Sequence, residues 1–209
     1  MAGDSRQKVN FSLATKSCNA HHNSMTLKLY GGARSRASII KWYLEEKNIP
    51  YEFVLLDLQA GDQQKPDFLA INPMGKVPAI VDGDVTCWES GAILLYLADH
   101  YAPEPLSSAH RAALTQWVMF SNATLGPGLF IESNREREGD RLLSSLNSVL
   151  EKSEYLVGDD LSAADIAVGA YLAYAMMMVQ LTYDNYGAIA TYVTNLTQRP
   201  AFKSTIGAR

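Results

Sequence analysis

The sequence predicts an α/β N-terminal half with the element order βαβαββα, followed by an all-helical C-terminal half. Up to residue 101, short apolar runs typical of strands alternate with segments of helical periodicity, whereas only helical periodicity follows residue 108. Two prolines in residues 102–108 indicate a linker between the halves. We therefore expect an N-terminal domain over residues 25–101 and a C-terminal domain over residues 109–209.

Composition excludes several functional classes. A hydrophobic content of 47% and a charged content of 19% are ordinary for a soluble globular protein, and a net charge of −4 favours neither nucleic acid nor a membrane as a partner. The longest apolar run, residues 166–179, is too short to cross a bilayer and predicts a buried helix. Two cysteines, Cys18 and Cys87, make no disulfide framework, so a reducing, cytoplasmic location is expected.

Residues 1–24 differ from the rest of the chain because they show no apolar periodicity. We expect a disordered N-terminal extension here, since the apolar core of a secretory signal is missing. An organelle transit segment is the alternative, and Met25 is a second candidate for the natural start. Cys18, His21 and His22 have no further ligands at suitable spacing, so no metal site is expected.

The first strand and helix carry an unusual pair of arginines. Residues 27–29 alternate as in a strand, Gly31-Gly32 predicts a turn, and apolar residues recur at helical spacing from about Ser35. Arg34 and Arg36 thus lie where the helix begins. A helix N-terminus attracts anions, so each arginine is unfavourable there by about 0.3–1 kcal/mol unless an anion is bound. The pattern indicates an anionic ligand.

The remaining elements follow in chain order. The N-terminal half should continue with a parallel second strand, a loop with one short helix, a β-hairpin and a closing helix (51–56, 57–70, 79–88, and from 89). The C-terminal half should hold helices over 112–123, 137–156 and 166–179, with a bend or break at 126–128, a capping box at 162–165 and a boundary at 199–200.

Two motifs in the N-terminal half suit a peptide-like ligand. Pro78 at the start of a strand removes a ladder donor, so Val77-Pro78 marks a turn whose peptide bond is cis or trans; a cis bond would leave the Val77 main chain facing outward. Glu89-Ser90 at a helix start is either a simple cap or a site in which Ser90 holds a carboxylate and Glu89 an ammonium group.

Together these motifs resemble the glutathione S-transferases over residues 25 to about 205. Three motifs carry the resemblance in the expected order: residues 72–78 (NPMGKVP), Glu89-Ser90, and residues 158–165 (GDDLSAAD). The resemblance implies a thioredoxin-like N-terminal domain, an all-helical C-terminal domain and glutathione as co-substrate.

The resemblance also implies roles for the site residues. The Val77 main chain, ahead of a cis Pro78, would pair with the cysteinyl part of glutathione, and Glu89 and Ser90 would hold its γ-glutamyl end. Gln63, Gln64 and Lys76 fall where the family places contacts to the glycyl carboxylate.

The reaction implied is attack by the glutathione thiolate on a small hydrophobic electrophile, with peroxidase or dehalogenase side activity, in a cytoplasmic homodimer that serves detoxification or the stress response. A non-catalytic glutathione-binding or protein-docking module of the same fold is an alternative. A glutathione-dependent thiol oxidoreductase is a third hypothesis, and the lack of a cysteine near the first helix start argues against it.

The residue that activates the thiol is the least usual feature. A free thiol with a pKa near 8.5 is mostly protonated at pH 7, so the protein must stabilise the anion. Residues 31–38 are most similar to the chi class of cyanobacteria, in which an Arg-x-Arg motif is proposed to replace the usual Tyr, Ser or Cys. If Arg34 and Arg36 are both helical they diverge by about 200°, so one would serve the thiolate. Catalysis by Ser35 beside two solvated arginines is the alternative.

The electrophile should bind between the domains, against the loop after the first strand and the first long C-terminal helix. Trp117, Met119 and Phe120 are candidates, although residues at such spacing are more often core. The same core interpretation is expected for residues 176–178 and for Cys87.

Overall fold

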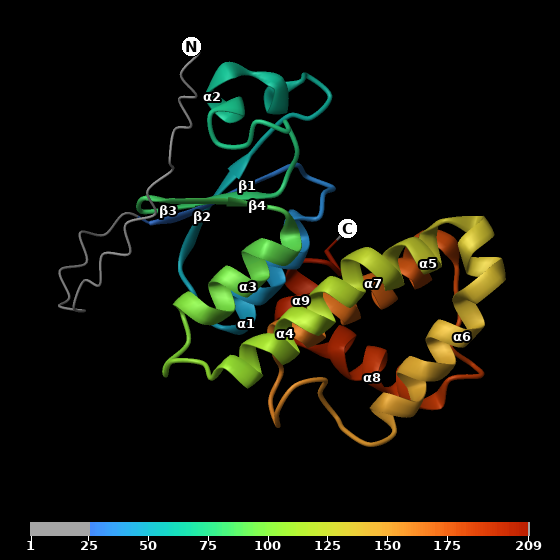
Figure 1. Cartoon of the computed structure of the whole chain (residues 1–209). Helices are drawn as coiled ribbons and strands as arrows, with labels where there is room; N and C mark the ends of the chain where they lie inside the picture. Colours follow the sequence, from blue (N-terminus) through green and yellow to red (C-terminus); the bar gives the residue numbers. More distant parts are fainter. Residues whose placement is uncertain (1–25, 209) are drawn as a thin grey trace, which may run out of the picture.

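The structure, a computed structural model, describes residues 26–208, so the predictions made for residues 1–24 lie outside it. The N-terminal half has the predicted order βαβαββα (Figure 1), with a short 3-10 turn η1 before α2. Its elements are β1 (Leu27–Gly31), α1 (Ala37–Glu46), β2 (Tyr51–Leu55), η1 (Asp62–Gln64), α2 (Pro66–Leu69), β3 (Ala79–Asp82), β4 (Val85–Trp88) and α3 (Ser90–His100).

These strands form one mixed sheet with the order β2-β1-β3-β4. β1 runs parallel to β2, as the βαβ pattern predicts, and antiparallel to β3, which pairs antiparallel with β4. Helices α1 and α3 lie on one face of the sheet and α2 on the other (Figure 1). Both α1 and α3 also face the C-terminal helices, so they form the layer between sheet and helical half.

The core is continuous across this layer because α1 is apolar on most of its surface. Six of its ten residues are buried, including Ile40 and Trp42. The Trp42 ring packs edge-on against Phe202, with ring centroids 5.0 Å apart. Next to this pair, Arg199 donates from Nε and Nη2 to the Glu46 carboxylate, each at 2.8 Å. Aromatic packing and a bidentate ion pair therefore tie the two halves together.

The C-terminal half of the described chain is helical, as predicted. Its elements are α4 (Ser108–Phe120), a π-turn η2 (Ser121–Leu125), α5 (Gly126–Phe130), α6 (Glu132–Leu150), α7 (Ala163–Val179), α8 (Gly187–Gln198) and α9 (Pro200–Ser204). No helix in the part of the chain described here is long and apolar enough to cross a membrane.

The path between α4 and α6 excludes the break, one of the two alternatives expected at residues 126–128. The helix does not break at Gly126-Pro127-Gly128, because it widens into η2 and continues through α5 until Ile131 becomes extended. Pro127 has no N–H to donate, and a shifted hydrogen-bond pattern ahead of it accommodates that loss. The glycines permit close packing: a Cβ on Gly126 would lie 2.6 Å from the Tyr171 ring, and one on Gly128 would lie 2.4 Å from Leu142.

Helix α7 is buried over most of its length and begins with the predicted capping box. Asp165, fully buried, accepts hydrogen bonds from the Ser162 N–H (2.9 Å) and hydroxyl (2.7 Å), the Leu156 N–H (2.9 Å) and the Tyr192 hydroxyl (2.9 Å). The bond to Leu156 also explains why α6 ends at Leu150 rather than near the predicted residue 156: the chain turns back to reach Asp165.

Candidate functional site

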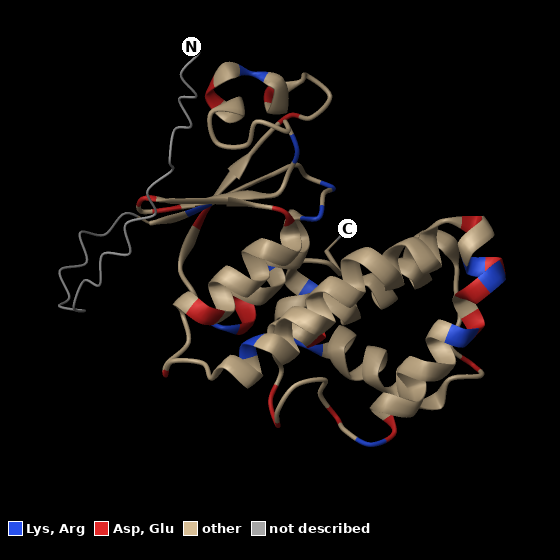
Figure 2. Ribbon diagram, viewed as in Figure 1, with Lys and Arg blue, Asp and Glu red and all other residues tan. Residues whose placement is uncertain are grey.

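Three separate motifs meet at one edge of the sheet. Tyr30 pairs with Ala79, and Ala79 pairs with Trp88. One step further along each antiparallel pair, Pro78 lies between Gly31 and Glu89. The register alone therefore brings together the arginine-containing turn, the Val77-Pro78 turn and the Glu89-Ser90 helix start. Figure 2 shows basic and acidic segments side by side at this edge.

The Val77-Pro78 peptide bond is cis. The preceding loop is held by Asn72, which is 1% exposed: its Nδ2 donates to the Lys76 carbonyl at 2.7 Å and its Oδ1 accepts from the Met74 N–H at 3.0 Å. Within residues 26–208, the Val77 N–H and C=O make no hydrogen bond with another residue. The main chain of Val77 is thus available to a ligand.

Glu89 and Ser90 lie where β4 ends and α3 begins. Glu89 has φ +71°, a conformation that costs a non-glycine residue about 1–3 kcal/mol. Ser90, 2% exposed, is the first residue of α3, and no side chain caps this helix start. The N–H groups of the first turn and the Ser90 hydroxyl have no side-chain partner among the described residues, while the Glu89 carboxylate reaches solvent.

The turn after β1 is organised by Ser35. Its Oγ donates to the Gly32 carbonyl at 3.1 Å and accepts from the N–H groups of Gly32 (3.2 Å) and Ala37 (3.3 Å). Helix α1 begins at Ala37, so Arg34 and Arg36 both precede it. The helix therefore begins two residues later than the predicted start near Ser35. Because neither arginine is helical, their different directions follow from the turn and not from the step of about 100° per residue in a helix.

The two arginine side chains have different surroundings. Arg36 Nη1 donates to the Tyr171 hydroxyl of α7 at 3.3 Å, and Tyr171 in turn donates to Asn122 Oδ1 at 3.0 Å. Asn122 Nδ2 lies 2.9 Å from the position that a Cβ on Gly91 would occupy. Two hydrogen bonds thus join Arg36, just before α1, through Tyr171 to Asn122, which packs close to Gly91 of α3. Both arginines are exposed, but Arg34 takes no part in these hydrogen bonds.

Sequence reasoning did not identify Tyr171 and Asn122 as the hydrogen-bonding neighbours of Arg36. Tyr171 did offer a signal, because a hydroxyl in an apolar helix needs a partner when buried. The partner could not be identified, since Arg36 and Asn122 lie 135 and 49 residues away from it in the sequence.

The three residues expected at the glycyl end lie near one another but differ in orientation. Gln64 Nε2 donates to the Gly75 carbonyl at 3.3 Å, next to the exposed Lys76. Gln63 Nε2 donates instead to the Leu58 carbonyl at 3.3 Å, and its buried Oε1 has no partner among the described residues.

The apolar candidates divide into two groups. Trp117 and Phe120 are half-buried and pack edge-on against each other, with ring centroids 5.5 Å apart. Met119 is exposed, and so are Met176, Met177 and Met178 at 45%, 49% and 66%, so the core interpretation of residues 176–178 is wrong. Cys87 is half-buried in β4, where burial raises the pKa of its thiol despite an opposing hydrogen bond with the Trp88 backbone.

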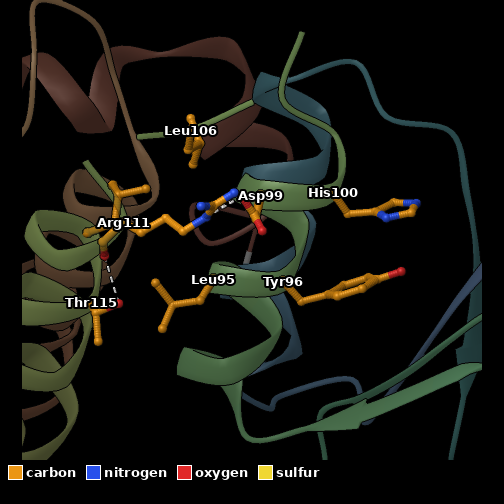
Figure 3. A pocket seen from close by; sticks show the side chains of 8 residues that line it. Leu95, Tyr96, Asp99, His100, Leu106, Arg111 and Thr115 are labelled. Atoms are coloured by element: carbon orange, nitrogen blue, oxygen red, sulfur yellow. Dashed lines mark hydrogen bonds and ion pairs between the residues drawn. The ribbon is translucent and has the colours of Figure 1, made fainter. Parts of the chain in front are cut away.

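Arg34 separates two hollows, of about 310 Å³ toward α1 and the C-terminal residues and about 630 Å³ toward residues 55–62. A third hollow, of about 370 Å³, lies between α3 and α4 (Figure 3). The Asp99–Arg111 ion pair (2.8 Å) crosses it, and none of the predicted site residues lines it. No group of His, Cys, Asp and Glu in the described region could hold a metal ion.

Comparison with known proteins agrees with this geometry. Residues 25–99 match the glutathione S-transferase N-terminal domain, and residues 132–200 match the C-terminal domain of the same proteins. Glutathione S-transferase GstB of Escherichia coli (strain K12) is 33% identical over 185 residues, covering 78% of this chain and 88% of the relative. Disulfide-bond oxidoreductase YfcG of the same strain is 32% identical over 202 residues, covering 84% and 92%.

A solved structure is similar over most of the fold. The glutathione transferase from Burkholderia graminis, with two glutathione molecules bound per subunit, superposes with a TM-score of 0.76 and 29% identity, covering 86% of each chain. The fold and site define a two-domain protein with a thioredoxin-like half and a helical half. The chain belongs to the glutathione S-transferase family.

Proposed function

We propose that this protein is a glutathione transferase that binds glutathione at the sheet edge and joins the glutathionyl group, through its sulfur, to a small electrophile. One observation carries the proposal: by the strand register, Pro78 follows next between Gly31 and Glu89, so the three motifs proposed to bind the ligand lie at one end of neighbouring strands. Family membership supports the same reaction class.

The γ-glutamyl end of glutathione would bind at the start of α3. Glu89 would pair with its ammonium group, and Ser90 with the unpaired N–H groups of α3 would receive its carboxylate. The positive φ of Glu89 supports this assignment, because strained backbone conformations cluster at functional sites, where the surrounding structure holds them in place.

The rest of the tripeptide would extend along the Val77-Pro78 turn. The Val77 main chain would pair with the cysteinyl unit as an added strand. Gln64 and Lys76 lie beside this turn and would contact the glycyl carboxylate. Gln63 donates its amide N–H to the Leu58 carbonyl, so only its unpartnered Oε1 remains to accept a hydrogen bond from an N–H of the ligand.

We assign stabilisation of the thiolate to Arg36. Arg36 lies just before α1, and its guanidinium is oriented by the hydroxyl of Tyr171 in α7. The positive charge of the guanidinium and the N-terminus of α1 would both lower the pKa of a nearby thiol. Ser35 is less suited because its hydroxyl proton is donated to the Gly32 carbonyl. An Arg-x-Arg activation of this kind is the pattern proposed for the chi class, so membership in that class stays a prediction.

Disulfide reduction by bound glutathione is a second candidate, favoured by the relative named a disulfide-bond oxidoreductase. The glutathione thiolate would then attack a disulfide sulfur in place of a carbon. In the described residues the sole cysteine is Cys87, which lies in β4 away from the start of α1. Peroxidase and dehalogenase side activities, a role in detoxification or stress response, a homodimer and a cytoplasmic location also stay predictions.

Retention on immobilised glutathione and release by free glutathione test the proposal. We expect wild type and Ser133→Ala, a control on the exposed side of α6, to be retained, and Ser90→Ala to pass through. Retained protein should also accelerate thioether formation from glutathione and an aryl halide. Retention without acceleration would support the non-catalytic module, and no retention of wild type would contradict glutathione binding.

A further inference from the structure

The hollow between α1 and the end of the chain has an unusual lining. It measures about 310 Å³, and Figure 1 shows the C-terminal residues returning to the N-terminal half where this hollow lies. Gly32, Ala33 and Arg34 form one wall, so the hollow adjoins the same turn after β1 that carries Arg36. The remaining lining residues are Ala37, Ser38, Lys41, Phe53, Ser204, Thr205 and Ala208.

The described residues that line this hollow carry only positive charge. Arg34 and Lys41 contribute two cations, and none of the described lining residues is acidic, although acids outnumber bases by 22 to 18 in the chain. Neither cation forms an ion pair within the described part of the chain, where the nearby Glu45 accepts from the Tyr51 hydroxyl at 2.9 Å. Two cations in a shared concave site attract an anion.

Lys41 is held in place rather than freely solvated. Its Nζ lies 3.3 Å from the centroid of the Phe53 ring, a cation–π contact. Burial lowers the pKa of Lys41, with the charge of Glu45 opposing the shift, and the amine has no hydrogen-bonded counterion within the described residues. A bound anion would supply one.

Two hydroxyl groups in the lining already donate to the main chain, so Arg34 and Lys41 are the principal hydrogen-bond donors left for a ligand. Thr205 donates to the Ala201 carbonyl at 2.6 Å and Ser204 donates to the same carbonyl at 3.1 Å. Their protons are therefore engaged inside the chain. A ligand entering the hollow would meet charged donors on Arg34 and Lys41 and the apolar edge of Phe53.

We propose that the second substrate carries a negatively charged group, of which a carboxylate is the model, and that Arg34 and Lys41 bind this group in the hollow. The inference rests on the proposed function, and it changes the expected electrophile from a purely hydrophobic molecule to one with an apolar reacting part and an anionic end. In the transfer, a sulfur–carbon bond forms, and the leaving group departs with the electron pair of its broken bond. The thiol proton has already passed to water.

Binding of two product mimics tests the proposal without requiring turnover. The probes are S-(4-carboxybenzyl)glutathione and its neutral counterpart S-(4-carbamoylbenzyl)glutathione, and isothermal titration calorimetry measures the dissociation constant of each. Wild type should bind the carboxylate about tenfold more tightly than the amide. Lys41→Gln and Ala208→Glu should each abolish that preference, whereas Lys41→Arg and the control Lys203→Gln should keep it.

The outcomes separate the two proposals. Equal binding of both probes by wild type, or a preference unchanged by Lys41→Gln, would overturn the anionic substrate while leaving glutathione binding intact. Weaker binding of glutathione itself to Lys41→Gln would assign the hollow to the glycyl carboxylate and would also overturn it. Failure of wild type to bind either probe or glutathione would contradict the proposed function.

Discussion

Arg36 of the N-terminal half donates to the hydroxyl of Tyr171 in the C-terminal half at 3.3 Å. The Tyr171 hydroxyl in turn donates a hydrogen bond to Asn122, which lies against Gly91 at the start of α3. The orientation of the proposed thiolate-stabilising arginine therefore depends on a helix from the other half of the chain.

Removal of one oxygen should weaken this dependence. Tyr171→Phe keeps the ring contact with Phe130 but deletes the hydroxyl that orients Arg36. We expect the pKa of bound glutathione to rise by about 0.5–1 unit, as measured by thiolate absorbance in the ultraviolet, with glutathione affinity changed by less than about twofold. Tyr174→Phe, which loses a contact with Ser38 on the same face of α7, is the control. Equal shifts in both variants would indicate general loosening of α7 instead.

Relief of the strain at Glu89 should separate stability from binding. Glu89→Gly permits φ +71° without steric cost and should raise the free energy of unfolding by about 1 kcal/mol, while glutathione binding is lost. Asn48→Gly is the matched control, since Asn48 has φ +52° at the end of α1, away from the site. Denaturant titration and calorimetry measure the two effects. Undiminished binding by Glu89→Gly would exclude Glu89 as the ammonium ligand.

The Asp165 carboxylate should be the largest single polar contribution to the helical half. Asp165→Ala leaves four donors unpaired in the core, at a cost of about 3 kcal/mol or more in the free energy of unfolding. Asp159→Ala, on the exposed loop before the capping box, should change it by less than about 0.5 kcal/mol. Similar denaturation midpoints for the two variants would disprove the role of Asp165.

The Glu46–Arg199 pair predicts a specific acid sensitivity. Burial raises the pKa of Glu46, but hydrogen bonds from Arg199 and Trp42, together with the charges of Arg199 and Lys47, outweigh it and hold the pKa below its usual value. Because the folded pKa is depressed, the stabilisation is complete above the unfolded pKa of about 4.3 and is lost as pH falls through the folded pKa.

The measurement is the difference in melting temperature between wild type and Glu46→Gln across a pH series. The Glu46 carboxylate is 8% exposed, so at pH 7 the variant should melt lower. The difference should shrink below about pH 4.3, when wild type also becomes protonated. Glu45→Gln, in the same helix turn but exposed, controls for the loss of a carboxylate from α1. A constant difference for Glu46→Gln would contradict the linkage.

Short sequence patterns correctly predicted the features that depend on residues close together in the sequence. The Ser162–Asp165 capping box, the β-hairpin at residues 82–84 and the order of elements all depend on residues a few positions apart, and the structure confirms them. For Gly126-Pro127-Gly128 the sequence left a bend or a break open, and the break is wrong: glycine indicates either a break or close packing, and the deciding neighbour, Tyr171, is distant in sequence.

Tertiary contacts account for the remaining differences. Met176–Met178 continue the apolar pattern of α7, yet they are exposed, unlike Tyr171 and Tyr174, which contact Arg36 and Ser38 one to two turns earlier in α7. The separate surroundings of Arg34 and Arg36 likewise depend on the C-terminal half: Arg34 lines a hollow to which Ser204, Thr205 and Ala208 also contribute, and Arg36 contacts Tyr171 of α7. Neither partner could be found from the turn sequence.

The pKa of the glutathione thiol bound to wild type, Arg34→Ala, Ser35→Ala and Arg36→Ala tests the central claim most directly. Ultraviolet titration should show an increase of about one unit or more in Arg36→Ala and a smaller increase in Arg34→Ala, because a positioned guanidinium stabilises the thiolate most strongly. An increase confined to Ser35→Ala would contradict the account and identify the serine hydroxyl as the activating group.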